Sequence, residues 1–388
     1  MESKGLLTKI GIIGGGQLSK MLLLEAKKLG FATAVLDPDE HCPARIIADK
    51  HIQAPLDAPD ALRALADCCD VLTYEESASI DSGALLAPEA EGVRIYPSAK
   101  SLSLVRDRWT QKQTLRSGGV PVPDFVSVSD MPELRAAAAA FGYPFLLKSR
   151  VGGRDKRENY VLRGEKEMET GYAALGGGET LLMAERIVPF LMEAAVLACR
   201  GADGSIAVYP VGQCLYENNL LLETRVPAQL TQKTRERAIA VAERVVKLFD
   251  GVGVFCVKLF VQADGGVLVN DVTPHPHDAG LYSTEGCVTG QLEQHVRAVM
   301  ELPLGDASLI RPAVTRALPG IPGTGCVAVE GRAQALAVSG VKLYIYGNRD
   351  TSPRQKTGYL SVTADTVEKA AMLAESAWRK VRIVPAKE

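Results

Sequence analysis

The sequence contains no long hydrophobic run. No part of its 388 residues approaches the roughly 18 uninterrupted apolar residues that a membrane span needs. The opening stretch MESKGLLTKIGIIGGG leads directly into a strand-like run instead of a cleavable signal peptide. We therefore expect a cytoplasmic protein with no membrane partner.

A basic surplus is also missing. Lysine and arginine number 44 against 46 aspartates and glutamates, which leaves a net charge of −2. Proteins that grip a nucleic-acid backbone need an excess of positive charge, so nucleic acid is not an expected partner. The hydrophobic content of 47% instead indicates a globular chain, and the length indicates two or three domains.

The eight cysteines show neither a CxxC motif nor a paired metal spacing. Several of them lie within apolar, strand-like runs. We expect reduced thiols in the core, and we do not expect a disulfide between Cys68 and Cys69.

Short apolar runs alternate with amphipathic stretches over the first hundred residues, from KIGIIGG at residue 9 to RIYPS at residues 94–98. This alternation predicts a βαβαβ arrangement with a parallel sheet. One helix is predicted from about residue 101 to 123, followed by a small domain of short strands. Residues 190–300 predict a larger sheet with a helix from Thr231 to Leu248, and the tail predicts short strands with a last helix.

Three consecutive glycines, Gly14 to Gly16, precede the helix that is predicted to begin at Gln17. Such a loop allows close backbone approach and presents helix N-terminal amides to an anion. The GxGxxG spacing is broken by Ser19, which disfavours a dinucleotide site despite Asp37 at a strand end. A plain tight turn explains the glycines nearly as well.

The run GVFCVKLF at residues 253–260 predicts a strand buried on both faces, yet it contains Lys258. An ammonium group cannot be buried without a partner. The sequence therefore predicts that an anionic group holds this lysine.

Several motifs follow one another in a characteristic order: GGGQL, TYE, TQKQ, VPFxxE and NDVTPxPH. In this order the chain resembles the ATP-grasp superfamily and, more closely, the N5-carboxyaminoimidazole ribonucleotide synthetase family, from residue 9 to about 360. The resemblance implies an α/β ATP-grasp fold with an N-terminal Rossmann-like domain at 1–105. It also implies an ATP-grasp region at 106–304 and a small C-terminal domain at 305–388, and within the ATP-grasp region a lid at about 124–185 and a larger sheet at 186–304.

The resemblance also implies an enzyme, an ATP-dependent carbon–nitrogen ligase of purine biosynthesis. Its small-molecule substrates would be ATP, bicarbonate and the amine of aminoimidazole ribonucleotide, joined through carboxyphosphate. Magnesium would be a cofactor, and a homodimer would be the oligomeric state.

An ATP site needs cations for the phosphates, a carboxylate for the ribose and a hinge for adenine. The resemblance places Arg108 and Lys148 at the phosphates, Glu185 at the adenine hinge and Glu193 at the ribose. The other residues that it implies for the nucleotide are Gly152, Gly153, Arg154, Arg186, Val188, Tyr216, Lys258 and Asn270. For the acceptor it implies Gly15, Gly16, Gln17, Glu75, His275 and Asp278, and for catalysis Asp155, His277 and Lys356.

The chain departs from this family at the metal site. Family members have a glutamate where this chain has Lys258, and a second one where it has Asp271. We expect the ammonium to replace the charge of a metal and to be held by Asp271 or by a bound phosphate. Asp271, with Asn270, is then the remaining candidate for a magnesium ligand, and a snorkelling lysine is the plain alternative.

Other departures concern the loops. The glycine-rich triphosphate loop of the family reads GGRDKREN at residues 152–159, which is stiffer and bulkier. At the acceptor site, His275 and Asp278 replace an arginine and an asparagine, which weakens the case for a phosphorylated acceptor. Two histidines and two aspartates between residues 271 and 278 also allow a metal cluster. Two other functions stay open: a nucleotide-binding regulatory protein that has lost turnover, and a ligase with a different acceptor.

Overall fold

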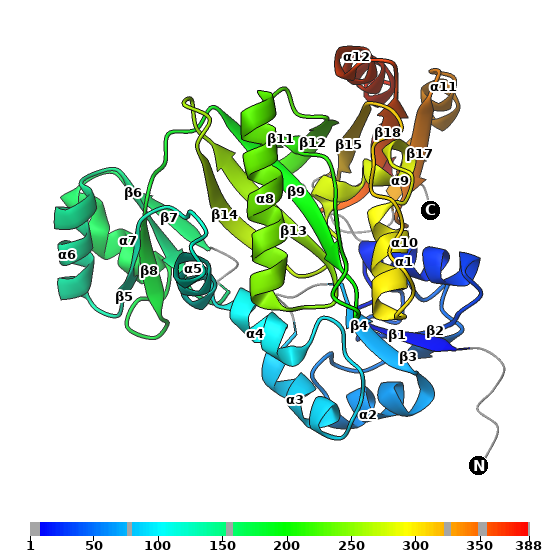
Figure 1. Cartoon of the computed structure of the whole chain (residues 1–388), viewed down its shortest axis with the longest axis horizontal. Coiled ribbons are helices and arrows are strands. Elements are labelled where there is room, and N and C mark those ends of the chain that lie inside the picture. The colour runs from blue at the N-terminus through cyan, green and yellow to red at the C-terminus, as the bar shows by residue number, and fades with distance from the viewer. Residues whose placement is uncertain (1–7, 76–79, 153–157, 322–326, 348–354, 387–388) are drawn as a thin grey trace.

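The computed structural model describes residues 8–75, 80–152, 158–321, 327–347 and 355–386 (Figure 1). The N-terminal part contains a four-stranded parallel sheet in the order β3-β2-β1-β4. Its strands are β1 (Lys9–Ile13), β2 (Ala32–Leu36), β3 (Lys50–Ile52) and β4 (Val71–Tyr74), and its helices are α1 (Gln17–Lys28), α2 (Pro59–Cys68) and α3 (Ser82–Ala90). The predicted parallel sheet is therefore confirmed. The strand predicted at 94–98 is wrong, because only an isolated bridge joins Ile95 to Leu72.

The single helix predicted from about 101 to 123 is also wrong, since the chain forms two helices, α4 (Ala99–Arg106) and α5 (Arg108–Ser117). Asp107 separates them because its backbone is extended and its carboxylate accepts the amide hydrogens of Trp109 and Thr110. An aspartate that caps one helix in this way ends the preceding one.

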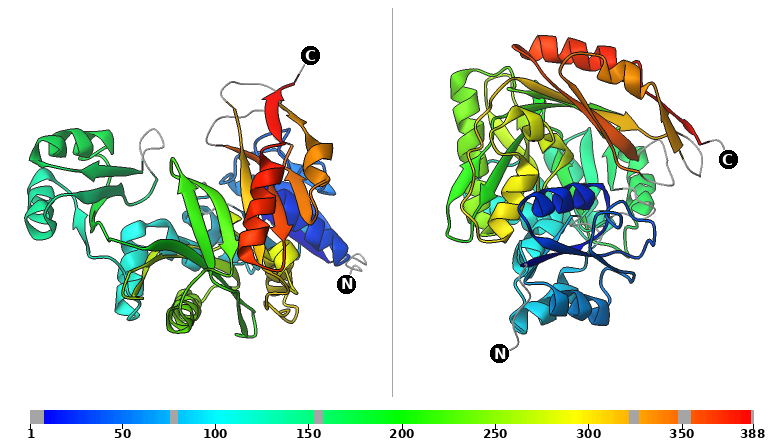
Figure 2. Two further views of the ribbon diagram at one scale, coloured as in Figure 1. Left: turned by 90° about the horizontal axis from the view of Figure 1, so that it is seen from above. Right: turned by 90° about the vertical axis from the view of Figure 1, so that its right-hand side faces the viewer.

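A small antiparallel sheet in the order β5-β8-β6-β7 follows and stands at one end of the molecule, away from the N-terminal sheet (Figure 2). We call residues 124–186 the lid. Its strands are β5 (Phe125–Val128), β6 (Phe145–Ser149), β7 (Asn159–Leu162) and β8 (Leu182–Arg186), and its helices are α6 (Met131–Phe141) and α7 (Met168–Ala174).

The largest sheet has nine strands, in the order β14-β13-β9-β11-β12-β15-β18-β17, with β10 paired to β9. Its strands up to residue 273 are β9 (Met192–Arg200), β10 (Ile206–Val208), β11 (Gly212–Glu217), β12 (Leu220–Val226), β13 (Gly253–Val261) and β14 (Val267–Thr273). Helix α8 (Gln232–Phe249) lies across one face of this sheet (Figure 1). The predicted helix beginning after Thr231 is confirmed, and the Thr231 hydroxyl caps it.

The C-terminal strands extend the same sheet, because β15 pairs with β12. They are β15 (Ala313–Pro319), β17 (Val341–Ile345) and β18 (Lys356–Thr363), while β16 (Val327–Glu330) and β19 (Arg382–Pro385) form a separate pair. Helices α11 (Arg332–Leu336) and α12 (Val367–Trp378) pack on this part, as Figure 2 shows for the red α12.

The short helix α9 (Ser283–Gly286) packs on β15 and β18, and helix α10 (Gln291–Val299) fills the space between the N-terminal sheet and the nine-stranded sheet. His295 of α10 joins them: its Nδ1 accepts the Val254 amide hydrogen, so its Nε2 carries the hydrogen that meets the Thr73 hydroxyl at 2.8 Å. This buried contact fixes the N-terminal domain against the sheet and so shapes the cleft between them.

Seven of the cysteines fall among the described residues, and all seven are free thiols, including Cys68 and Cys69 with their sulfur atoms 3.8 Å apart. Within those same residues, no helix is both long and apolar enough to cross a bilayer.

Candidate active site

Two cavities are lined by residues that the sequence predicted for a site. The first, which we call the lid cavity, lies between the lid and strands β9, β11, β13 and β14 and has a volume of about 590 Å³. A smaller space of about 190 Å³ extends it toward the start of α5 and shares four lining residues with it. Together they are lined by Arg108, Gln111, Lys112, Lys148, Glu158, Asn159, Glu193, Tyr216, Asn218, Asn219, Leu220, Lys258, Asn270 and Asp271.

The second, which we call the N-terminal cavity, is also about 590 Å³ in volume and lies between the N-terminal sheet and the segment after β14. Its lining includes seven residues predicted from the sequence: Gly16, Gln17, Glu75, His275, His277, Asp278 and Lys356. Leu220, at the start of β12, lines both cavities. The start of β12 therefore lies beside both spaces.

A buried cluster of three charges forms the inner wall of the lid cavity. Glu185 of β8 places its Oε1 2.6 Å from Lys148 Nζ of β6 and its Oε2 2.7 Å from Lys112 Nζ of α5. Burial alone would raise the pKa of Glu185, but the two ammonium groups hold that pKa below its usual value. Because two lysines share one carboxylate, the cluster keeps a net positive charge that can bind a phosphate. The Glu185 side chain is 1% exposed and does not reach the cavity surface.

The partner of Lys258 is Asp271, as predicted. The two residues lie opposite each other on β13 and β14, and their ion pair measures 3.1 Å. On the face of β13 that carries Cys256 and Lys258, burial ends after Cys256, because at Lys258 this face opens into the lid cavity. Burial works against both charges, but the Lys258 ammonium holds the pKa of Asp271 well below its usual range.

The residues present here do not fit a pair of magnesium ions. Magnesium needs octahedral oxygen coordination. One Asp271 oxygen faces the Lys258 ammonium, and the other lies 3.4 Å from the Gln111 amide nitrogen. Throughout the described part of the chain, no three histidine, cysteine, aspartate or glutamate side chains are grouped so as to hold a metal ion.

Arg108, the first residue of α5, is placed by two contacts. Its guanidinium donates to the Ser149 carbonyl at 2.9 Å and to Glu158 at 2.5 Å. These contacts hold a cation at the lid cavity, beside Glu158 and Asn159. Glu158 is one of the residues that replace a glycine of the family loop.

The glycine loop before α1 packs tightly against acidic side chains of the protein itself. The Gly15 amide donates to Asp37 at 2.6 Å, and Glu75 accepts the amides of Leu18 and Ser19 at 3.0 Å each. A Cβ atom at Gly16 would lie 2.6 Å from a Glu75 oxygen. The expectation that these amides serve a ligand anion is therefore wrong for the ones named here, and close packing explains the glycine at position 16.

Two neutral histidines line the N-terminal cavity. Burial lowers the pKa of His275 to about 4, and its Nδ1 donates to the Pro276 carbonyl at 2.8 Å. The Nδ1 of His277 accepts the Ala279 amide hydrogen at 3.0 Å, so its Nε2 carries the hydrogen. One ring can thus accept a proton at Nε2, whereas the other can donate one.

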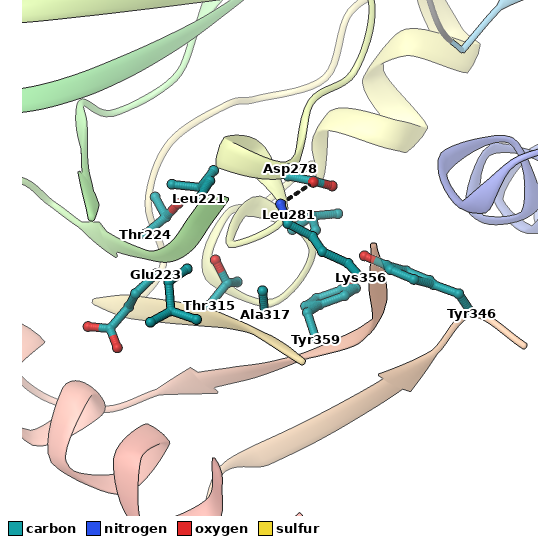
Figure 3. A pocket seen from close by; sticks show the side chains of 11 residues that line it. Leu221, Glu223, Thr224, Asp278, Leu281, Thr315, Ala317, Tyr346, Lys356 and Tyr359 are labelled. Carbon is teal, nitrogen blue, oxygen red and sulfur yellow. Dashed lines mark hydrogen bonds and ion pairs between the residues drawn. The ribbon is translucent and has the colours of Figure 1, made fainter. Parts of the chain in front are cut away.

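The cation of this cavity is already paired. The Lys356 side chain extends past Tyr359 and forms an ion pair with Asp278 (Figure 3). Burial alone would raise the pKa of Asp278, but Lys356 lowers it. An anionic substrate must compete with this carboxylate for Lys356.

Some predicted residues lie elsewhere. Among the described residues, Gly15, Gly152, Arg186 and Val188 do not line either cavity, and the Arg186 side chain binds Asp124 and two carbonyl oxygens of α6. Gly153, Arg154 and Asp155 lie outside the described residues.

Sequence reasoning missed Gln111, Lys112 and Leu220. The TQKQ motif contains the first two, but nothing in its spacing shows that α5 packs its side chains under β8 and β14. Leu220 is an ordinary apolar residue in the sequence, and only the fold shows that it lines both cavities.

Comparison with known proteins agrees with this geometry. Residues 113–292 match the ATP-grasp domain, and residues 7–106 match the ribonucleotide synthetase preATP-grasp domain. The fold and the cation-lined lid cavity thus define an α/β protein of the ATP-grasp class.

Two relatives of this class match nearly the whole of this chain. The N5-carboxyaminoimidazole ribonucleotide synthase of Bacillus subtilis is 34% identical, and the match covers 91% of this chain and 90% of that one. The crystal structure of N5-carboxyaminoimidazole ribonucleotide synthetase from Thermotoga maritima has 36% identity and a TM-score of 0.88, covering 98% of this chain and 100% of that one. The chain belongs to the N5-carboxyaminoimidazole ribonucleotide synthetase family of ATP-dependent ligases.

Two further relatives bear on substrates and length. The synthase of Aspergillus clavatus, crystallised with ADP and 5-aminoimidazole ribonucleotide, has 28% identity and a TM-score of 0.87, covering 96% of this chain and 99% of that one. The chloroplastic phosphoribosylaminoimidazole carboxylase of Vigna aconitifolia is 37% identical over 78% of this chain. This chain spans only 54% of the length of that plant protein.

Proposed function

We propose that this chain catalyses the ATP- and bicarbonate-dependent carboxylation of the amine of aminoimidazole ribonucleotide, a step of purine biosynthesis. The observation that carries the proposal is that the cation-lined cavity and the cavity with the predicted acceptor residues share a lining residue, Leu220. One cavity holds cations between two sheets, and the other gathers the residues that the family resemblance assigns to the acceptor. In this proposal a reactive intermediate formed in the first cavity passes to the second along this shared wall.

In the lid cavity, Arg108, Lys148 and Lys258 bind the phosphates of ATP, and Glu193 binds the ribose. A bicarbonate oxygen attacks the γ-phosphorus, the bond from phosphorus to the ADP oxygen breaks, and carboxyphosphate forms. The protein contributes position and fixed charge to this step.

In the N-terminal cavity, the amine nitrogen attacks the carboxyl carbon of the intermediate and phosphate leaves. The amine must lose one proton in this step. His275 is neutral, with Nε2 as its accepting nitrogen, and His277 donates from Nε2 to a substrate oxygen. Asp155 remains a proposed catalytic residue, with the same acceptor as its target.

The test measures ADP release from ATP with bicarbonate and aminoimidazole ribonucleotide, leaving out each substrate in turn. We expect release that requires all three and that is lost in Lys148→Met. The matched control is Lys247→Met, which removes an ammonium paired with Glu243 on the outer helix α8. No ADP release with the complete mixture would contradict the proposal.

A nucleotide-binding protein without turnover is the second candidate, and the Lys258–Asp271 pair at the metal position favours it. An ammonium anchors a phosphate but does not polarise it as a pair of divalent ions does. This candidate predicts that ADP and ATP bind while the complete substrate mixture releases no ADP.

We also propose a cytoplasmic location, a homodimer and the domain boundaries 1–105, 106–304 and 305–388. The resemblance to the synthetase family supports these three proposals. Sedimentation of the full chain tests the dimer.

A further inference from the structure

The lid cavity holds an ammonium at the position where the family resemblance expects a metal-binding carboxylate. Lys258 and Asp271 lie in register on adjacent strands, and both line the cavity. Their side chains are 24% and 36% exposed, so a ligand in the cavity can reach them. The pair is therefore part of the binding surface and not of the core.

The geometry leaves little room for a divalent ion at this pair. The Lys258 ammonium lies 3.1 Å from Asp271 Oδ2. It therefore occupies the position that a metal ion bound to this oxygen would need. The other oxygen lies 3.4 Å from the Gln111 amide nitrogen, and that amide also contacts the Val272 carbonyl at 3.1 Å. A magnesium ion would have to displace a cation that is covalently part of β13.

The charges that line the cavity also favour binding without a divalent ion. Replacing a carboxylate by an ammonium changes the local charge by two units, which equals the charge of one divalent ion. The lining carries the cations Arg108, Lys112, Lys148 and Lys258 against the carboxylates Glu158, Glu193 and Asp271. An ammonium has three N–H donors, and Asp271 uses one of them. The lysine can therefore contact a phosphate without giving up Asp271.

We propose that Lys258 takes the place of a divalent ion, so that the lid cavity binds the phosphates of ADP and ATP without magnesium. This inference rests on the proposed function, because it assumes a nucleotide in the lid cavity. It goes further by stating in which ionic form the nucleotide binds and which side chain neutralises it.

The experiment measures ADP binding by titration calorimetry, once with EDTA and once with excess magnesium. We expect dissociation constants that agree within about threefold for the wild-type chain. Lys258→Met removes a charge-assisted hydrogen bond, so affinity with EDTA should fall roughly 10- to 100-fold. Lys247→Met, the matched control on α8, should change nothing.

A reversed charge gives a second arm. Lys258→Glu should bind ADP only when magnesium is present, because it supplies a carboxylate beside Asp271. Should this variant fail to fold, Asp271→Asn replaces it. That variant should bind ADP with EDTA at least as tightly as wild type, since Lys258 loses its internal competitor.

Three results would overturn the inference. Binding of ADP that requires magnesium in the wild-type chain would refute it while leaving the proposed function intact. Weaker ADP binding by Asp271→Asn with EDTA would also refute it, because Asp271 would then not compete with the nucleotide for Lys258. No binding of ADP in either buffer would refute both the inference and the proposed function.

Discussion

Replacing Glu185 tests most directly whether this carboxylate neutralises the two buried lysines beside the lid cavity. Its carboxylate is 1% exposed and lies 2.6 and 2.7 Å from two ammonium groups, those of Lys148 and Lys112. Glu185→Gln keeps the volume of the side chain, so it creates no cavity. It leaves two buried ammonium groups without a counter-ion. Removing one partner of a buried ion pair destabilises a protein by about 3–5 kcal/mol, and we expect a loss of that size.

The pH dependence of this variant has a defined sign. Burial already lowers the pKa of Lys112, and Glu185 opposes that shift. Without Glu185 the pKa of Lys112 must fall further, so the unfolded state binds more protons than the folded state at pH values below 10.5. Stability then rises with pH in this range. The destabilisation of Glu185→Gln should therefore shrink between pH 7 and pH 10.

Urea denaturation of the variant and the wild-type chain at both pH values measures these quantities. Glu243→Gln is the matched control, because it removes the carboxylate of an exposed pair with Lys247 and should change stability by less than about 0.5 kcal/mol. A loss below about 1 kcal/mol in Glu185→Gln, or a loss independent of pH, would refute the argument that this carboxylate holds two buried charges.

Four further predictions concern the N-terminal side of the molecule. Burial lowers the pKa of His295 to about 3, so between about pH 6.5 and pH 3 only the unfolded state binds a proton at this residue. The free energy of unfolding should therefore fall by about 1.4 kcal/mol for each pH unit as the pH decreases. The His295→Gln variant should lack this part of the pH dependence, and equal slopes for variant and wild type would contradict the assignment. Gly16→Ala should lower both stability and acceptor binding, because its Cβ would displace Glu75; unchanged thermal unfolding and unchanged KM would contradict the packing argument. Lys356→Met should raise the KM for aminoimidazole ribonucleotide by at least about tenfold with little change in the KM for ATP, and equal changes in both would place Lys356 outside acceptor binding. Asp278→Asn should lower the KM for the same acceptor, because it frees Lys356 from its internal partner; a higher KM would mean that Asp278 itself binds the acceptor.

The pairing of Lys258 with Asp271 could be predicted from the sequence because two simple rules applied together. A charge inside an apolar strand needs a partner, and a strand thirteen residues away supplies one at its polar position. The parallel N-terminal sheet followed from hydrophobic alternation in the same way. Residues His275, His277, Asp278 and Lys356 came from motif order, and the structure brings all four to one cavity.

What could not be predicted depends on packing between distant segments. The sequence does not show that Lys112 and Lys148 converge on one glutamate, because α5, β6 and β8 are brought together only by the lid. The break at Asp107 was missed for a related reason: helix periodicity continues through it, whereas the capping carboxylate ends the first helix. Likewise the amides at the start of α1 looked suited to a ligand, but Glu75, the residue after β4, accepts hydrogen bonds from two of them.

Each cation that lines the described part of the two cavities has a carboxylate partner within the protein, and these partners set how the site binds anions. Lys258 pairs with Asp271, Lys356 pairs with Asp278, and Arg108 pairs with Glu158. A phosphate that binds must share or replace an existing partner, so its net gain is the difference between two charge-assisted contacts and not a whole one. Dianionic phosphate competes well against a single carboxylate, whereas chloride or bicarbonate alone does not. The paired cations therefore select for polyanions, and weakening a carboxylate partner should improve affinity and reduce that selectivity together.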